Sequence, residues 1–164
     1  MTTASCLIDY RGAHTFPVPP SELWDAMERT DRFQGWWRWL SEFRLEGDGL
    51  RAGSVLTGVV APPVPYRMRV RVDLEECVRP SRIRASVHGD LEGPAELRLA
   101  ARPGGSRVDA AWTLEMMQRP MRLAARVAHP LLRWGHDRVV DATVDGFRRH
   151  LASADPTGAG GGDG

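Results

Sequence analysis

The chain contains no lysine, little cysteine and almost no net charge. All 22 of its basic residues are arginine, and 21 acidic residues leave a formal net charge of +1. We attribute the arginine bias to genomic base composition rather than to phosphate chemistry. A nearly neutral chain carries no electrostatic footprint for nucleic acid, so we expect no nucleic-acid partner.

The two cysteines, Cys6 and Cys77, lack the spacing of a metal site or a redox pair. A disulfide framework would use more of them, so we expect both thiols to be reduced. No stretch approaches the ~18 uninterrupted apolar residues of a membrane span, and residues 1–10 lack the pattern of a secretory signal. We therefore expect a cytoplasmic protein without stable membrane insertion. No motif in the sequence indicates a metal or a cofactor.

Apolar and polar residues alternate in several stretches, which is the period of a half-buried strand. The clearest stretch is 66–75, where Tyr66, Met68 and Val70 alternate with arginines. A dry face and a wet face on one strand favour an antiparallel sheet over a buried parallel one. The same pattern brings the total to about seven strands, with the others at residues 6–16, 43–45, 55–60, 82–88, 96–101 and 108–116.

Two short helices are predicted between the first strand and the second. Pro20 suits the first position of a helix, and the apolar pattern supports a helix from there to Glu28. Asp31 is a suitable N-cap for a second short segment that reaches Trp39. These helices connect strand one to the rest of the sheet.

The C-terminal part of the chain has the apolar spacing of one long helix. Pro130 removes a backbone donor, so we expect a break or kink there and a continuous helix from Pro130 to Ala152. One face of that helix is apolar and collects Leu132, His136, Val139, Val140, Thr143, Phe147 and Leu151. A helix laid across a strongly curved antiparallel sheet leaves a cavity, so we predict a single α+β ligand-binding domain over residues 1–152. The Gly-rich tail over 153–164 is expected to be disordered.

Three segments add a family resemblance to this element order. They are HTFPVPPSELWDAM at residues 14–27, GDLEGPAELRL at 89–99 and HPLLRWGHDRVVDATVDGFRRHL at 129–151. Over about residues 5–152 the chain resembles the polyketide cyclase/dehydratase and lipid-transport superfamily, also called START-like or SRPBCC proteins. The resemblance implies the helix-grip fold, in which a curved seven-stranded sheet wraps around a C-terminal helix. Such proteins include aromatase/cyclases and lipid carriers, so the fold does not choose among functions.

Tryptophan is abundant, with six residues, and four of them fall in the region of the two short helices. Trp24 is the first apolar residue of its helix, so we assign it to the core. Trp36, Trp37 and Trp39 are too close together to share one helix face, so at least one must face solvent, a partner or the mouth of a pocket. These helices either plug one end of the sheet or form an aromatic wall over a ligand. On the second interpretation, Trp36 and Trp39 contact the ligand.

Further ligand contacts are expected from the inner faces of the strands and of the long helix. On the strands these are Tyr66, Met68, Trp112 and Met116, where Tyr66 adds a phenol and the methionines adapt to irregular shapes. On the helix they are His136 and Val140. In a fold with a cavity, inner-face residues line that cavity.

His136 lies at the centre of the apolar face of the long helix. We interpret it as a core histidine whose ring is satisfied by a strand tyrosine such as Tyr10 or Tyr66, and His14 is interpreted in the same way. The alternative is a catalytic base. His136, Tyr66 or an inward-facing arginine could therefore act in catalysis, and the catalytic residues remain open.

The sequence supports three functional hypotheses. The first is non-covalent binding of a hydrophobic or aromatic small molecule, polyketide-like or lipid-like, by a monomer or homodimer. The second is a polyketide cyclase/dehydratase that acts on a molecule held in the same cavity. The third is a protein-interaction module that uses the tryptophan cluster. A dry pocket favours the first hypothesis, and converging polar groups favour the second.

Overall fold

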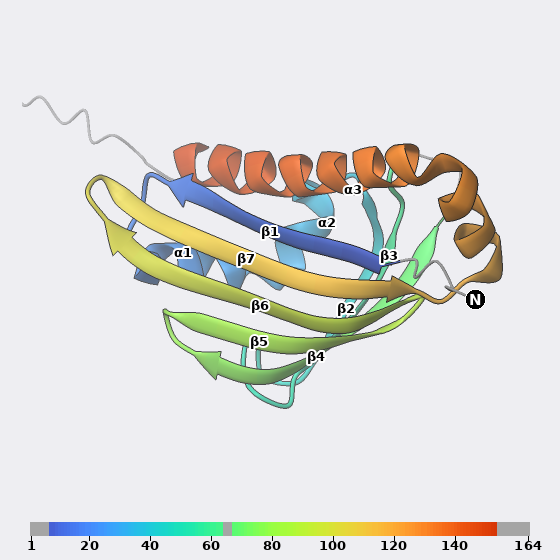
Figure 1. Cartoon of the computed structure of the whole chain (residues 1–164). Helices are drawn as coiled ribbons and strands as arrows, with labels where there is room; N and C mark the ends of the chain where they lie inside the picture. Colours follow the sequence, from blue (N-terminus) through green and yellow to red (C-terminus); the bar gives the residue numbers. More distant parts are fainter. Residues whose placement is uncertain (1–6, 64–66, 154–164) are drawn as a thin grey trace, which may run out of the picture.

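The computed structural model describes residues 7–63 and 67–153. Seven strands form one antiparallel sheet in the order β1-β7-β6-β5-β4-β3-β2, as the alternating pattern predicts. The strands are β1 (Leu7–Phe16), β2 (Leu40–Glu46), β3 (Val55–Val60), β4 (Met68–Val78), β5 (Arg82–Gly89), β6 (Leu91–Arg102) and β7 (Gly105–Met116). Figure 1 shows the sheet curving beneath a long helix that runs alongside β1 in space.

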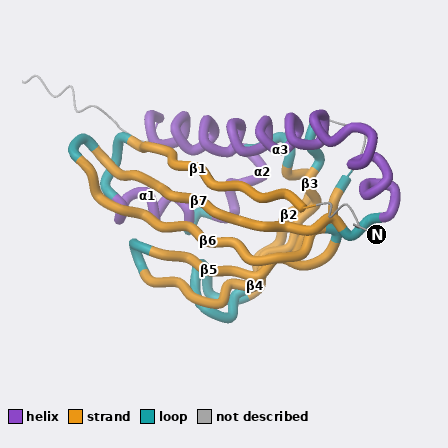
Figure 2. Tube along the Cα trace, viewed as in Figure 1, coloured by secondary structure: helices purple, strands orange, loops and turns teal. Residues whose placement is uncertain are grey.

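The helices follow the predicted order: α1 (Pro20–Met27), the 3-10 helix η1 (Thr30–Arg32), α2 (Phe33–Trp36) and α3 (Arg119–Ser153). The first three lie between β1 and β2, and α3 ends the described chain (Figure 2). No helix within the described ranges is long and apolar enough to cross a membrane.

The long helix continues through Pro130 instead of breaking there. It is one element of 35 residues with Pro130 inside it, and its first turns run at a steep angle to the rest (Figure 1). Proline bends a helix because its ring displaces the preceding turn. The kinked alternative of the prediction is therefore correct, and the segment from Pro130 to Ala152 is continuous.

The second short helix ends earlier than the sequence predicts. It stops at Trp36, and Trp37 has an extended backbone (φ −125°, ψ 112°). The expected capping role of Asp31 is also wrong, because Asp31 lies inside η1 and α2 has no side-chain cap. Gly35 weakens the helix, and Trp37 instead packs against α3.

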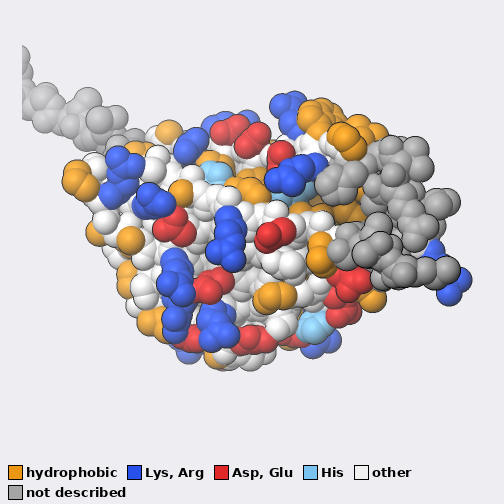
Figure 3. Space-filling model, viewed as in Figure 1, with side chains coloured by type: hydrophobic (Ala, Val, Ile, Leu, Met, Phe, Trp, Pro, Cys, Tyr) orange, Lys and Arg blue, Asp and Glu red, His pale blue; other side chains and the backbone are white. Residues whose placement is uncertain are grey.

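The core lies between the inner face of the sheet and the helices. Trp24 is 1% exposed, as its assignment to the core requires, and its Nε1 donates to Glu28 Oε1 at 3.0 Å. The outer face of the sheet is charged, with arginine and acidic side chains interspersed (Figure 3). Pairs such as Arg107 with Asp109 occupy that wet face, so the alternation of the strands separates core from solvent.

Several sequence predictions concern residues outside the described ranges. These are Cys6, Tyr66 and the Gly-rich tail from residue 154. Cys77 is a free, partly buried thiol, and burial raises its pKa.

Candidate functional site

A cavity of about 420 Å³ lies between α3 and the concave face of the sheet. That volume falls within the usual range of roughly 300–1,000 Å³ for small-molecule pockets. Two irregularities in the strand register, at Leu40/Glu42 and Leu74/Glu76, are of the kind that bend a sheet. Small side chains at Ala95 and Ala110 leave the space open on the inner face.

The wall of this inner cavity is almost entirely apolar. Among the described residues that line it, none is Asp, Glu or Arg. The polar side chains in the wall are His14, Thr143 and His136, together with two indole groups. A pocket of this kind favours an apolar ligand because burial of apolar area provides most of the binding free energy.

Most of the predicted ligand contacts lie in this wall. The structure places Trp39, Met68, Trp112, Met116, His136 and Val140 around the cavity. Trp36 lies outside it, in a groove on the surface. Tyr66 is outside the described residues. Contact of any of these side chains with a ligand stays a prediction.

His136 has a different partner from the predicted tyrosine. Trp112 Nε1 donates to His136 Nε2 at 3.0 Å, and an indole N–H can only donate. Nε2 therefore carries a lone pair, and the ring proton lies on Nδ1, which is 3.2 Å from the Asp137 carboxylate. Both ring nitrogens are occupied, which leaves His136 no free nitrogen for use as a base.

Tyr10 instead pairs with the other inner-face histidine, His14. The Tyr10 hydroxyl is 2.8 Å from His14 Nε2. The Tyr10 ring stacks on the Trp112 ring, with 4.5 Å between the ring centroids. Gly12 makes this possible, since a Cβ there would come within 2.1 Å of the hydroxyl oxygen. Burial raises the pKa of Tyr10, with Asp137 and another nearby carboxylate adding to the rise.

The surroundings of His14 disfavour its charged form. Burial lowers its pKa, the Arg148 guanidinium lowers it further, and Asp141 opposes the change. Tyr10, His14, Trp112 and His136 thus form a polar cluster at one side of an apolar cavity. All four side chains are hydrogen-bonded within the cluster.

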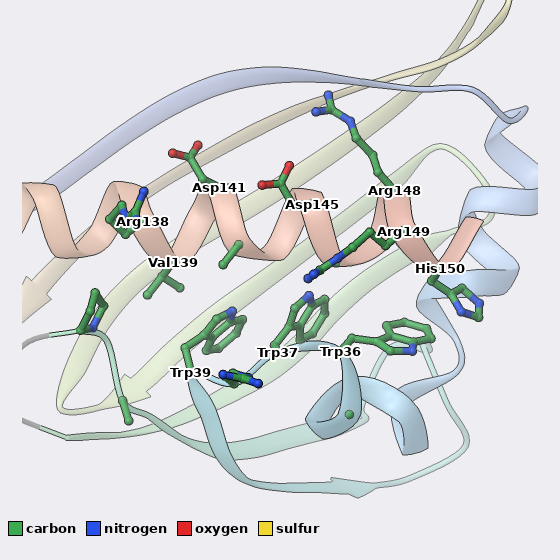
Figure 4. Close-up of a pocket in the computed structure, with 16 residues that line it drawn as sticks. Trp36, Trp37, Trp39, Arg138, Val139, Asp141, Asp145, Arg148, Arg149 and His150 are labelled. Carbon is green, nitrogen blue, oxygen red and sulfur yellow. The ribbon is translucent and has the colours of Figure 1, made fainter. Parts of the chain in front are cut away.

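A second, larger space of about 1240 Å³ opens on the surface beside α3. This outer groove lies between α3 and the segment Gly35–Trp39 (Figure 4), and Ala61 and Pro63 also line it. Trp36, Trp37 and Trp39 form its aromatic wall. The sequence indicated an aromatic wall but gave no sign of a groove against α3.

Trp37 attaches this wall to α3. Its Nε1 donates to the Thr143 carbonyl at 3.2 Å, and its ring stacks on the Trp39 ring with 5.3 Å between the ring centroids. Gly146 provides the space, because a Cβ there would lie 2.6 Å from Trp37 Nε1. The Trp36 ring packs on the His150 ring, with 4.2 Å between the ring centroids. Burial lowers the pKa of His150, and two nearby arginines lower it further.

The inner cavity and the outer groove meet at two residues. Trp39 and Val139 line both spaces. The Nε1 of Trp39 is buried and has no hydrogen-bond partner in the described part of the chain. Buried donors are nearly always paired, so this one calls for an explanation.

The comparisons with known proteins identify the fold. No family model and no curated protein matches the chain. Among solved structures, the protein TTHA0849 from Thermus thermophilus has a TM-score of 0.72 at 14% identity, covering 90% of this chain and 100% of that one. Ara h 8.0201 has a TM-score of 0.62 at 15% identity, over 90% and 99% of the two chains.

A third similar structure is the di-domain ARO/CYC protein BexL from the BE-7585A biosynthetic pathway. Its TM-score is 0.68 at 14% identity, and the match covers 92% of this chain and 52% of BexL. Identities this low establish architecture and leave activity open. With its seven-stranded antiparallel sheet closed by a C-terminal helix, the chain has the helix-grip fold.

Proposed function

We propose that this protein binds a hydrophobic or aromatic small molecule, without covalent chemistry, in the inner cavity. The observation that carries the proposal is the cavity of about 420 Å³ whose described wall contains no acidic or arginine side chain. The similarity in fold to Ara h 8.0201 and BexL supports a ligand-binding architecture. The absence of a membrane-spanning helix among the described residues is compatible with a cytoplasmic carrier.

A cyclase/dehydratase activity is the second candidate. It is favoured by the two imidazoles in the cavity wall, His14 and His136, and by the resemblance in fold to an ARO/CYC protein. Against it, His136 uses both ring nitrogens in hydrogen bonds, and the Nε2 of His14 is paired with Tyr10. Binding without turnover therefore fits the geometry better than acid–base catalysis.

The alternation of β7 provides a direct test with a matched control. Ala110 is buried in the cavity wall, whereas its neighbour Ala111 lies on the opposite face of the same strand. Phenylnaphthylamine, a neutral dye that fluoresces in apolar surroundings, is the probe. We expect Ala110→Phe to fill part of the cavity and weaken dye binding about tenfold or more, because the added ring occupies space that the dye needs.

Ala111→Phe adds the same ring outside the cavity and should leave the dissociation constant unchanged. Equal dye binding by both variants and by the wild type would place the dye outside the cavity. Circular dichroism of each variant checks that the sheet is intact.

A further inference from the structure

The outer groove contains more arginine than acid. Four arginines line it, Arg38, Arg138, Arg148 and Arg149, against the two acids Asp141 and Asp145. This imbalance lies next to an apolar cavity that it joins at Trp39 and Val139.

Two of these arginines already have partners. Arg148 donates to the Thr15 carbonyl at 3.1 Å and lies over the Phe16 ring, and Arg138 lies 5.7 Å from the Trp134 ring centre. Among the side chains that the structure describes, those of Arg38 and Arg149 make no hydrogen bond or ion pair. Their guanidinium groups are therefore available to a ligand.

The acids of the groove point away from the aromatic wall. In Figure 4, Asp141 and Asp145 project from the side of α3 that faces away from the tryptophans. Arg149 projects on the tryptophan side of α3. The tryptophan side of the groove is thus aromatic and positively charged.

We infer that the ligand is an amphipathic anion. Its apolar body occupies the inner cavity, its chain passes between Trp39 and Val139, and its carboxylate, phosphate or sulfonate group lies in the outer groove against Arg149 and Arg38. The planar guanidinium group matches such oxyanions in geometry and charge. This inference rests on the proposed function and adds the chemical class of the ligand.

The unpaired indole N–H of Trp39 is a second observation at the same place. A buried donor without an acceptor is unfavourable. An oxygen of the anionic group, or one next to it, would supply the missing acceptor as the ligand passes Trp39. An apolar body alone would leave that donor unpaired.

Two dyes of the same aromatic body test this inference. Anilinonaphthalene sulfonate is phenylnaphthylamine with a sulfonate group, so the ratio of their dissociation constants isolates the anionic group. We expect the wild type to bind the sulfonate about fivefold more tightly at low salt, as befits a partly exposed ion pair. The advantage should shrink as salt rises, while binding of the neutral dye stays constant.

Arg149→Gln should reduce binding of the sulfonate dye by about threefold, and the double variant Arg38→Gln/Arg149→Gln should remove the advantage. Neither change should alter binding of the neutral dye, which also reports that the cavity is intact. Arg133→Gln is the control, because Arg133 is an exposed arginine of α3 that does not line the groove.

Each outcome separates the two proposals. Equal affinity for both dyes, or a loss in Arg133→Gln as large as in the double variant, overturns the inference and leaves the proposed function standing. Binding of neither dye overturns the proposed function and the inference together. A sulfonate advantage that only the groove variants abolish supports both.

Discussion

The inner cavity and the outer groove share two residues but differ in chemistry. The described wall of the cavity lacks acids and arginines, whereas the groove combines three tryptophans with four arginines and two aspartates. The His14, His136 and Trp112 side chains that reach the cavity are hydrogen-bonded, as Trp112 is to His136. In the groove, Arg149 and the buried Trp39 N–H have no partner among the described residues. The unpaired polar groups therefore lie in the groove and at Trp39, which lines both spaces.

The largest effect is expected where the aromatic wall meets α3. Gly146→Ala would place a Cβ 2.6 Å from Trp37 Nε1, whereas Gly35→Ala adds a methyl group with nothing within 4 Å. Overpacking should make Gly146→Ala less stable than Gly35→Ala by about 1–3 kcal/mol in urea unfolding. Equal free energies of unfolding would mean that the attachment of Trp37 to α3 contributes little to the groove.

A smaller effect should distinguish a paired indole from an unpaired one. Trp112→Phe and Trp39→Phe remove the same atoms, but only Trp112 loses a hydrogen bond, which goes to His136. We expect Trp112→Phe to cost about 1 kcal/mol more, the usual net value of one hydrogen bond. Thermal and urea unfolding of both variants measures this difference. A larger cost for Trp39→Phe would contradict the assigned partners.

The smallest effect concerns pH. The pKa of His14 is lowered by burial and by Arg148, and the pKa of His150 is lowered by burial and by two arginines. In the unfolded chain both histidines should titrate near the reference pKa of about 6.5, so below that pH the unfolded state binds more protons. The stabilisation is complete above that pH and is lost as pH falls through the folded pKa values.

Unfolding of the wild type, His14→Gln and His150→Gln across this range tests the prediction. Each substitution should flatten the fall in stability toward acid, with His14→Gln reporting on the cavity and His150→Gln on the groove. Identical pH profiles for all three proteins would show that neither histidine is coupled to folding.

Sequence periodicity was sufficient for the fold and for much of the inner cavity. The two-residue repeat of a strand assigns Met68 and Trp112 to the inner face of the sheet. Helical spacing likewise assigns His136 to the face of the long helix that lies toward the sheet. The predicted tyrosine partner of His136 was wrong, because strand register decides which side chain of β1 or β7 reaches the histidine. Tyr10 and Trp112 lie opposite each other on β1 and β7, so the sequence could not distinguish them.

The outer groove could not be predicted for a related reason. Its wall is held by the bond from Trp37 to the Thr143 carbonyl, which joins residues 106 positions apart. Helical periodicity also extended the second short helix to Trp39, although tertiary packing ends it at Trp36. Local patterns define faces of elements, and this site depends on which faces meet.

A crystal structure of the protein with anilinonaphthalene sulfonate tests the central claim most directly. We expect the rings of the dye in the inner cavity beside Val139 and Thr143, with the sulfonate in the outer groove near Arg149. Dye bound on the outer side of α3, where Leu131 and Trp134 are about half exposed, with no dye in the cavity, would contradict it.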